Sequence, residues 1–324
     1  MVCVSASLGE KEIIFPEMVA ITIGLWIVNK RVWKVYRWQI VLLMTLGAVA
    51  GMCIVRYSPL PDLYNLCLAF IFAGSCLLIS RSTLIPLISA CMLPVLLHTE
   101  SWVYPLTVFA LSLTGVLVQK CMEYYGVRQS FNFTPPERVW RKDLVRWLWL
   151  LCFVFLIGSL ALWTDSPYLI IPPLVVTFVE MVNSKSGFRA RPVQVFLFLV
   201  TGASVGTYAQ IWGFHYLHLP EGVVASFIIL CLFAIFEWTG KYFAPAGALA
   251  FIPLVVRQDL LPWLPLQATI GAALFIAIAM LFFQKCYKWD KARLAYCFTP
   301  TLLREHLNHR KASIKSRTQT LSQK

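Results

Sequence analysis

Two stretches of this chain, about 155 residues apart, repeat one pattern. Residues 39–51 read QIVLLMTLGAVAG, and residues 194–206 read QVFLFLVTGASVG. Further matched positions are, in pairs, 13–16 (IIFP) with 170–173 (IIPP), Pro86 with Pro245, and Pro94 with Pro253. The chain therefore reads as a tandem duplication. Duplicated halves in an apolar chain are typical of polytopic membrane proteins, many transporters among them.

The composition points to lipid as the surroundings of the chain. Hydrophobic residues make up 59% of it and charged residues 13%, and the mean hydropathy is +0.72. So few polar side chains cannot cover a soluble globule of this size. We therefore predict an all-α, polytopic membrane protein.

Apolar runs near the ~20 residues that a membrane-spanning helix needs recur along the chain. We expect eleven spans, at 13–28, 39–56, 63–80, 83–98, 103–119, 146–164, 168–184, 192–212, 222–240, 244–257 and 265–284. The fourth and the tenth are short, so they are either full spans or buried, re-entrant segments. Five spans in each half and a linking sixth make the two repeats parallel, with the expected path at their interface.

The basic residues predict the orientation, because cytoplasmic loops retain Lys and Arg. With the 29–37 loop inside, all of the 28 Lys and Arg residues lie on the cytoplasmic side except Lys11, Arg56 and Arg257. We expect the N-terminus outside, the C-terminus in the cytoplasm, no removable signal peptide, and a location in a bacterial inner membrane. This sidedness accounts for the basic excess without a nucleic-acid partner.

The expected organisation has four parts. Residues 1–120 form the first five-helix repeat, and 121–166 form a cytoplasmic linker with the linking helix. Residues 167–285 form the second repeat, and 286–324 form a basic cytoplasmic tail.

Three carboxylates within the apolar runs are candidates for an ion relay, because ionisable groups inside a membrane are costly and rare. They are Glu17, Glu180 and Glu237. The alternative is that Glu180 and Glu237 reach the inner interface, where Glu237 pairs with Lys241 one helical turn later. The sequence leaves both interpretations open.

Two helix starts, one in each half, are candidates for a small anion site. A helix start offers free amide donors, and here a cation and a proline accompany each one. The residues are Lys241, Pro245, Ala246 and Gly247 in the second half, and Arg81, Ser82, Thr83 and Pro86 in the first. Gln39 and Gln194 either line the same mouth or lie at the water boundary. The alternative to a site is two proline-started helices that pack through small residues.

The glycines and cysteines indicate structural roles rather than a functional site. The glycines at 47, 51, 202 and 206 have the small-xxx-small spacing of close helix packing. The ten cysteines lack CxxC or Cys/His ligand spacing, so we expect neither a metal nor a cofactor.

The second half resembles the HPP family, whose signature continues Ala-Gly-Ala after its prolines. The matching segment is Phe243-Ala244-Pro245-Ala246-Gly247-Ala248, and 191–195 followed by 205–206 resembles the family's upstream motif. Phe243 and Leu199 stand at the family's histidine positions, and Ala244 at its first proline. The resemblance implies a polytopic integral membrane protein, and some plastid members are linked to nitrite transport.

We therefore predict a transporter or channel for a small solute, such as an inorganic anion like nitrite, and no enzyme activity. The expected partners are the lipid bilayer and that solute. One alternative is a non-transporting membrane scaffold or regulatory subunit, in which the basic tail is the working part. A membrane-embedded lipid-modifying enzyme is a further alternative, although no DxxxD or HExxH pattern supports it.

Overall fold

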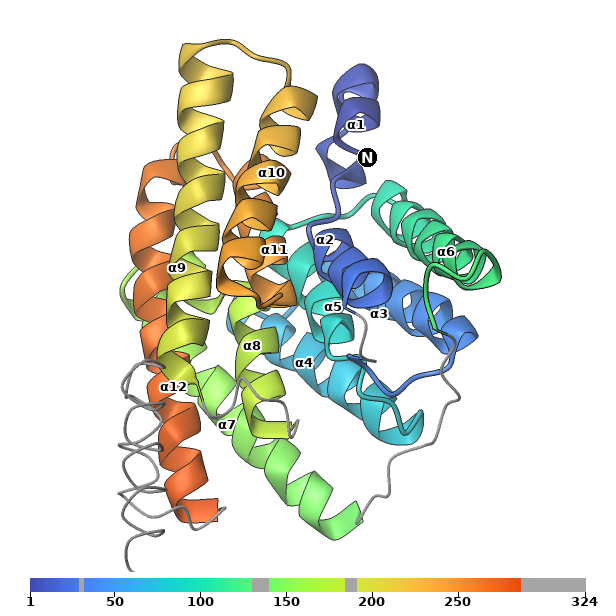
Figure 1. Cartoon of the computed structure of the whole chain (residues 1–324). Helices are drawn as coiled ribbons and strands as arrows, with labels where there is room; N and C mark the ends of the chain where they lie inside the picture. Colours follow the sequence, from blue (N-terminus) through green and yellow to red (C-terminus); the bar gives the residue numbers. More distant parts are fainter. Residues whose placement is uncertain (29–31, 130–139, 184–190, 287–324) are drawn as a thin grey trace, which may run out of the picture.

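The computed structural model describes residues 1–28, 32–129, 140–183 and 191–286 (Figure 1). Within these ranges the protein is all-α, with twelve helices, α1 to α12. The predicted tail therefore lies outside the described residues from 287 onward, as does 130–139 of the predicted linker.

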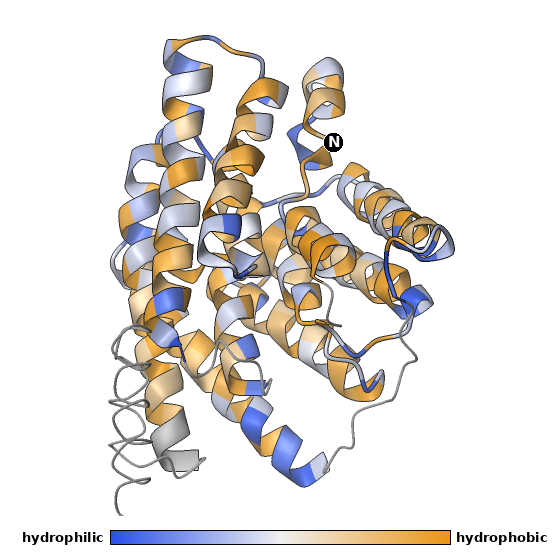
Figure 2. Cartoon of the chain, viewed as in Figure 1, coloured by the Kyte–Doolittle hydropathy of each residue, from blue (hydrophilic) through white to orange (hydrophobic). Residues whose placement is uncertain are grey.

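In the described part of the chain, seven helices are long and apolar enough to cross a membrane. They are α3 (Arg37–Tyr57), α4 (Asp62–Ile79), α6 (Val103–Tyr124), α7 (Trp140–Trp163), α9 (Pro192–Ala209, extended by π-helical turns to Tyr216), α10 (Glu221–Thr239) and α12 (Leu264–Cys286). Figure 2 shows that hydrophobic residues cover most of their length. A multi-span helical membrane protein follows from their length and composition.

Four predicted spans form shorter helices. They are α2 (Glu17–Thr22, extended by π-helical turns to Ile27), α5 (Pro86–Leu97), α8 (Pro172–Asn183) and α11 (Ala244–Phe251, followed by a 3-10 turn to Leu254). A helix of twelve residues, such as α5, is about 18 Å long, well below the ~30 Å of a bilayer core. The structure thus gives seven candidate spans, where the sequence predicted eleven.

Buried non-helical residues explain the difference in length. The stretch from Tyr168 to Ile171 is apolar and buried, but it forms the end of a 3-10 turn and one non-helical residue before α8. Val255 and Val256 likewise follow the end of α11. Hydropathy counts these residues as part of a span, because it does not distinguish a buried turn from a helix.

The four short helices contact one another in a ring at the centre of the protein. α2 packs against α5, α5 against α8, α8 against α11, and α11 against α2. The long helices α3 and α9 pack on the outside of this ring, against α5 and α11 respectively. The ring combines helices from both ends of the sequence, so neither half forms it alone.

Glycines allow α3 and α9 to approach the ring closely. A methyl group on Gly51 would overlap the Cys91 carbonyl of α5, and one on Gly206 would overlap the Ala250 carbonyl of α11. One turn earlier, a Cβ on Gly202 would lie 2.6 Å from the Ala246 carbonyl oxygen. Helix packing through small residues, expected from their spacing, accounts for these glycines.

One helix was not expected from the sequence. The N-terminal α1 (Val2–Leu8) packs against α10, where the Cys3 side chain lies against Gly222. At seven residues it is too short to give a clear periodic signal.

Candidate functional site

A small cavity lies inside the ring of short helices, and we call it the central cavity. Its volume is about 10 Å³, roughly the space that one water molecule needs. All four short helices and the loop before α3 contribute to it. The lining residues are Glu17, Ala20, Trp33, Pro86, Ser89, Pro173, Val176, Glu180, Ala244, Pro245 and Ala248.

Glu17 is a fully buried carboxylate in the wall of this cavity. It is the first residue of α2, after Pro16, and only 1% of it is exposed. Its Oε1 accepts a hydrogen bond from the hydroxyl of Ser89 on α5. Its Oε2 is buried and has no hydrogen-bond partner in the part of the chain that the structure describes. One carboxylate oxygen is therefore available to a proton or a polar solute.

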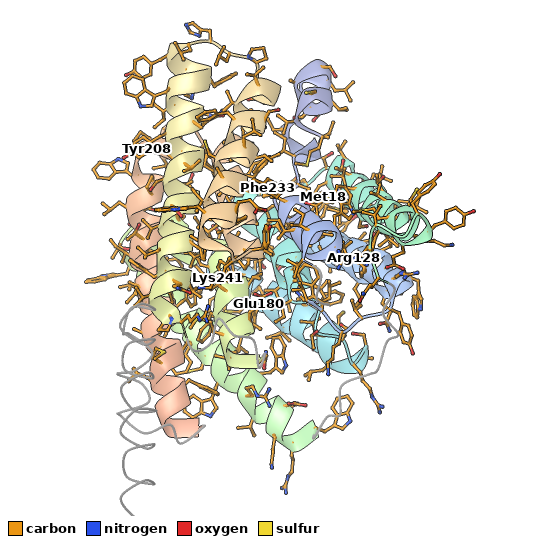
Figure 3. All side chains as sticks on the ribbon, viewed as in Figure 1. Met18, Arg128, Glu180, Tyr208, Phe233 and Lys241 are labelled. Carbon is orange, nitrogen blue, oxygen red and sulfur yellow. The ribbon has the colours of Figure 1, made fainter. Side chains whose placement is uncertain are left out.

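Glu180 provides a second carboxylate to the same cavity. It lies on α8, near the middle of the molecule (Figure 3). Its Oε1 accepts a hydrogen bond from Trp33 Nε1 at 3.4 Å. Two of the three predicted relay residues thus line one cavity.

The third predicted relay residue lies elsewhere. Glu237, in the last turn of α10, accepts a hydrogen bond from the Tyr242 hydroxyl, which lies beyond the end of that helix. This bond raises the pKa of Tyr242, because the phenol proton is shared with a carboxylate. Glu237 is not among the residues that line the central cavity.

The two candidate cations of the anion site are also outside the central cavity. Lys241 donates a hydrogen bond to Gln194 Oε1 at 3.1 Å. Arg81 is exposed and has a φ of 49°, in the left-handed region. Pro86 and Pro245, by contrast, do line the cavity.

The other predicted site residues make structural contacts. Ser82 is buried with its Oγ 2.9 Å from Ser80 Oγ, and Thr83 Oγ1 accepts a hydrogen bond from the Lys34 amide. Gln39 accepts from the Tyr36 amide and so caps the start of α3. The two small residues pack instead. Ala246 presents its carbonyl to α9, and Gly247 faces Val19 and Ile23 of α2.

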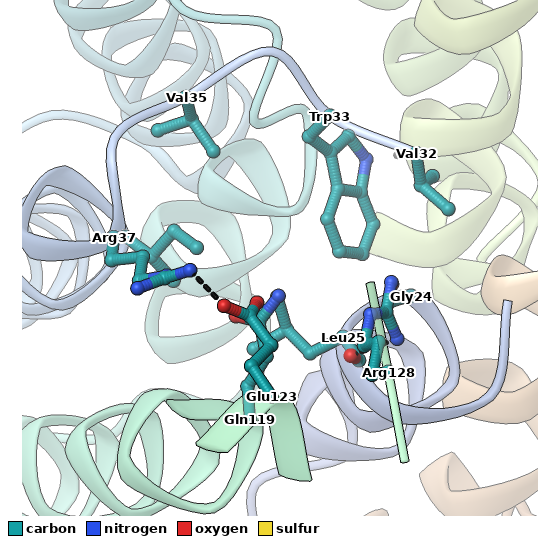
Figure 4. Close-up of a pocket in the computed structure, with 10 residues that line it drawn as sticks. Gly24, Leu25, Val32, Trp33, Val35, Arg37, Gln119, Glu123 and Arg128 are labelled. Atoms are coloured by element: carbon teal, nitrogen blue, oxygen red, sulfur yellow. Dashed lines mark hydrogen bonds and ion pairs between the residues drawn. The ribbon is translucent and has the colours of Figure 1, made fainter. Parts of the chain in front are cut away.

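A second, more polar cavity lies beside the first, and we call it the vestibule (Figure 4). Its volume is about 30 Å³, and Gly24, Leu25, Val32, Trp33, Val35, Arg37, Ile40, Gln119, Glu123 and Arg128 line it. Arg37 and Glu123 form an ion pair across it. The sequence did not single out these residues, because the partners are 86 positions apart.

Arg128 closes the end of α2 at the wall of the vestibule. It donates hydrogen bonds to the carbonyl oxygens of Leu25, Val28 and Gly24, the last two at 2.8 and 3.4 Å. Carbonyls at a helix C-terminus lack partners within the helix, so a guanidinium is a suitable cap. Burial lowers the pKa of Arg128, an effect that nearby Glu123 opposes.

One sequence pattern suggests an enzyme, but its structural context does not fit. Residues 202–206 read GASVG and match the GxSxG motif, which in hydrolases forms a turn between a strand and a helix. Here Ser204 lies within α9 and lines an apolar groove of about 610 Å³ between α9 and α10. The described residues that line the groove include no histidine and no acidic residue that could act as a base for this serine.

Among the described residues, no group of three His, Cys, Asp or Glu side chains could hold a metal ion.

Comparison with known proteins does not identify the chain. No family model matches the chain, and no curated protein or solved structure matches it either. The resemblance to the HPP family, and the nitrite that it implies, therefore stay predictions.

Proposed function

We propose that the chain is an integral membrane transporter for a small solute, with its path through the central cavity and with Glu17 as a proton-carrying group. The observation that carries the proposal is the burial of Glu17, one oxygen of which has no hydrogen-bond partner among the described residues, in a cavity that all four short helices line. The cost of an ionisable residue inside a membrane is at least ~2.5 kcal/mol, which makes a functional role its default interpretation.

The architecture that we propose is two parallel repeats, related by the sequence duplication. Equivalent contacts support it. Pro86 and Pro245 line the cavity as the first prolines of α5 and α11, and the glycines of α3 and α9 pack on these helices at matching positions. Transporters with repeats bind their solutes at the repeat interface, where helices are short or interrupted.

The chemistry of the cavity favours a solute that moves together with protons. Glu17 is held on one side by Ser89, and Glu180 lies on another wall. A carboxylate in so small and apolar a space stays charged only when a cation or a polar group joins it. Protonation of Glu17 would remove this charge and change what the cavity accepts.

The orientation of the path follows from the basic residues. Because Lys and Arg mark cytoplasmic loops, the loop before α3, and with it the vestibule, belongs on the cytoplasmic side. The N-terminus is then outside. The same rule accounts for the Arg and Lys residues at the start of α7.

Flux measurements test this proposal. Purified protein in liposomes is given nitrite, nitrate, formate, chloride, bicarbonate and neutral solutes of similar size, with and without a pH gradient. We expect saturable flux of one solute, driven by the gradient. In Glu17→Gln the driven flux falls at least about tenfold, which corresponds to ~1.4 kcal/mol of barrier.

The matched control is Glu237→Gln, which removes a carboxylate outside the cavity and leaves the flux unchanged. If no solute in the panel is taken up, the scaffold becomes the better interpretation. Equal flux in Glu17→Gln and the parent protein would contradict the role of Glu17.

A further inference from the structure

Trp33 is the residue that the central cavity and the vestibule share. It lines both cavities, and only 4% of it is exposed. Figure 4 shows its ring extending from the loop before α3 toward Gly24 and Arg128. We propose that this indole is the barrier between the two cavities and limits which solutes reach Glu17. The selectivity part of this inference rests on the proposed function, whereas the barrier itself does not.

The ring is held in place on two sides. A Cβ on Gly24 would overlap the indole and lie 2.6 Å from its Cη2 atom, so only glycine leaves room for the ring there. On the cavity side, Trp33 Nε1 donates its hydrogen bond to Glu180. Glu180, a carboxylate of the proposed path, is therefore hydrogen-bonded directly to Trp33, the residue of the barrier.

The backbone beside Trp33 is also anchored. The Lys34 amide donates to Thr83 Oγ1 at 2.7 Å, and the Thr83 amide donates back to the Lys34 carbonyl at 3.1 Å. Thr83 lies three residues before Pro86, a lining residue of the central cavity. The barrier is thus tied to α5, so a shift of α5 would carry the loop with it.

The central cavity is so small that the position of the Trp33 indole decides which solutes can enter it. About 10 Å³ on the inner side admits one water molecule at most. A larger solute enters only when the indole leaves its position against Gly24. Loss of the ring would join the two spaces and open the inner one to the vestibule.

Thiol accessibility tests the barrier without any transport assay. The parent carries Ala20→Cys in the cavity wall, and its native cysteines are replaced by alanine or serine. Methyl methanethiosulfonate, a small neutral reagent, is added to the purified protein, and mass spectrometry follows modification. We expect Trp33→Ala to react at least about tenfold faster than the parent, and Trp33→Phe to react at nearly the parent rate.

Trp147→Ala is the matched control, because Trp147 also packs on a glycine, Gly74, but lines neither cavity. Its modification rate should equal that of the parent. Equal acceleration in both alanine variants would mean general loosening and would overturn the proposal, as would no acceleration in Trp33→Ala. Gly24→Ala provides a second test, since it displaces the ring without removing it. Slow modification in Gly24→Ala would also contradict the barrier.

The two proposals fail in different ways. A fast reaction in Trp33→Ala together with no flux of any solute would retain the barrier and reject the transporter. Normal flux with unchanged accessibility would retain the transporter and reject the barrier. If both hold, Trp33→Ala should in addition carry solutes larger than those that the parent protein accepts.

Discussion

Two of the polar residues that line the central cavity, Glu17 and Ser89, lie in the first half of the chain, and Glu180 lies in the second. In the sequence alignment of the halves, Glu17 corresponds to Leu174, and Ser89 corresponds to Ala248. The hydrogen bond between Glu17 and Ser89 therefore has no counterpart in the second half. The duplication that we propose accounts for the matched prolines and glycines of the scaffold. The two copies differ at Glu17 and Ser89, which are residues to which we assign the chemistry of the cavity.

At the residue scale, Arg128 should be important for stability. Arg128→Met removes the donors to three carbonyl oxygens at the end of α2, and buried acceptors without partners are costly. We expect a loss of about 2 kcal/mol, measured by thermal unfolding in detergent. Arg56→Met is the control, because Arg56 is exposed beside the Tyr57 ring. An equal effect of the two substitutions would show that Arg128 does not act as a cap.

At the scale of the helices, sequence patterns predicted the long elements well. The long helices α3, α4, α9 and α10 begin and end within a few residues of their apolar runs, because a run of this length has few alternatives to a helix. The short helices were overestimated, since buried turns such as Tyr168–Ile171 are as apolar as a span.

The residues of the proposed site also differ in how clearly the sequence indicated them. The sequence singled out Glu17 and Glu180 as candidates, because a carboxylate in an apolar run is conspicuous, and both line the cavity to which we assign the proposed function. Ser89, Trp33 and Arg128 were not found. Each of them acts through a partner that lies between 72 and 147 positions away, and one sequence does not show such pairs. Ser89 had only a weak signal, one turn after Pro86.

The contact between α9 and α11 gives a prediction at this scale. Gly206→Ala places a methyl group on the Ala250 carbonyl, a backbone atom that cannot move away without shifting α11. We expect a loss of about 1–3 kcal/mol in thermal unfolding, the range of overpacked cores. The control is Gly115→Ala, whose nearest neighbour is the flexible Met18 Cε at 3.1 Å. Alanine favours the helix there by about 1 kcal/mol, so the two variants should change stability in opposite directions.

At the scale of the whole molecule, the two halves complete one another. The first half contributes α2 and α5, and the second contributes α8 and α11. The contacts α2 to α11 and α5 to α8 close the ring between them. The sequence predicted two halves with a site at their interface, but it did not predict this arrangement of four short helices. Side-chain packing decides which short helices contact one another, and a sequence duplication alone does not predict these contacts.

Because the halves share the ring, a chain cut between α6 and α7 should stay together. We expect fragments 1–129 and 140–324, expressed together with a tag on one of them, to purify as a pair in mild detergent. Gly247→Leu should reduce the recovered partner, since a Cβ there already lies 2.8 Å from Ile23 Cδ1 and 2.9 Å from Val19 Cγ1 of the other half. Thr114→Leu, at an exposed position on α6, should leave recovery unchanged. Independent purification of each fragment would contradict a shared ring and, with it, a path between the halves.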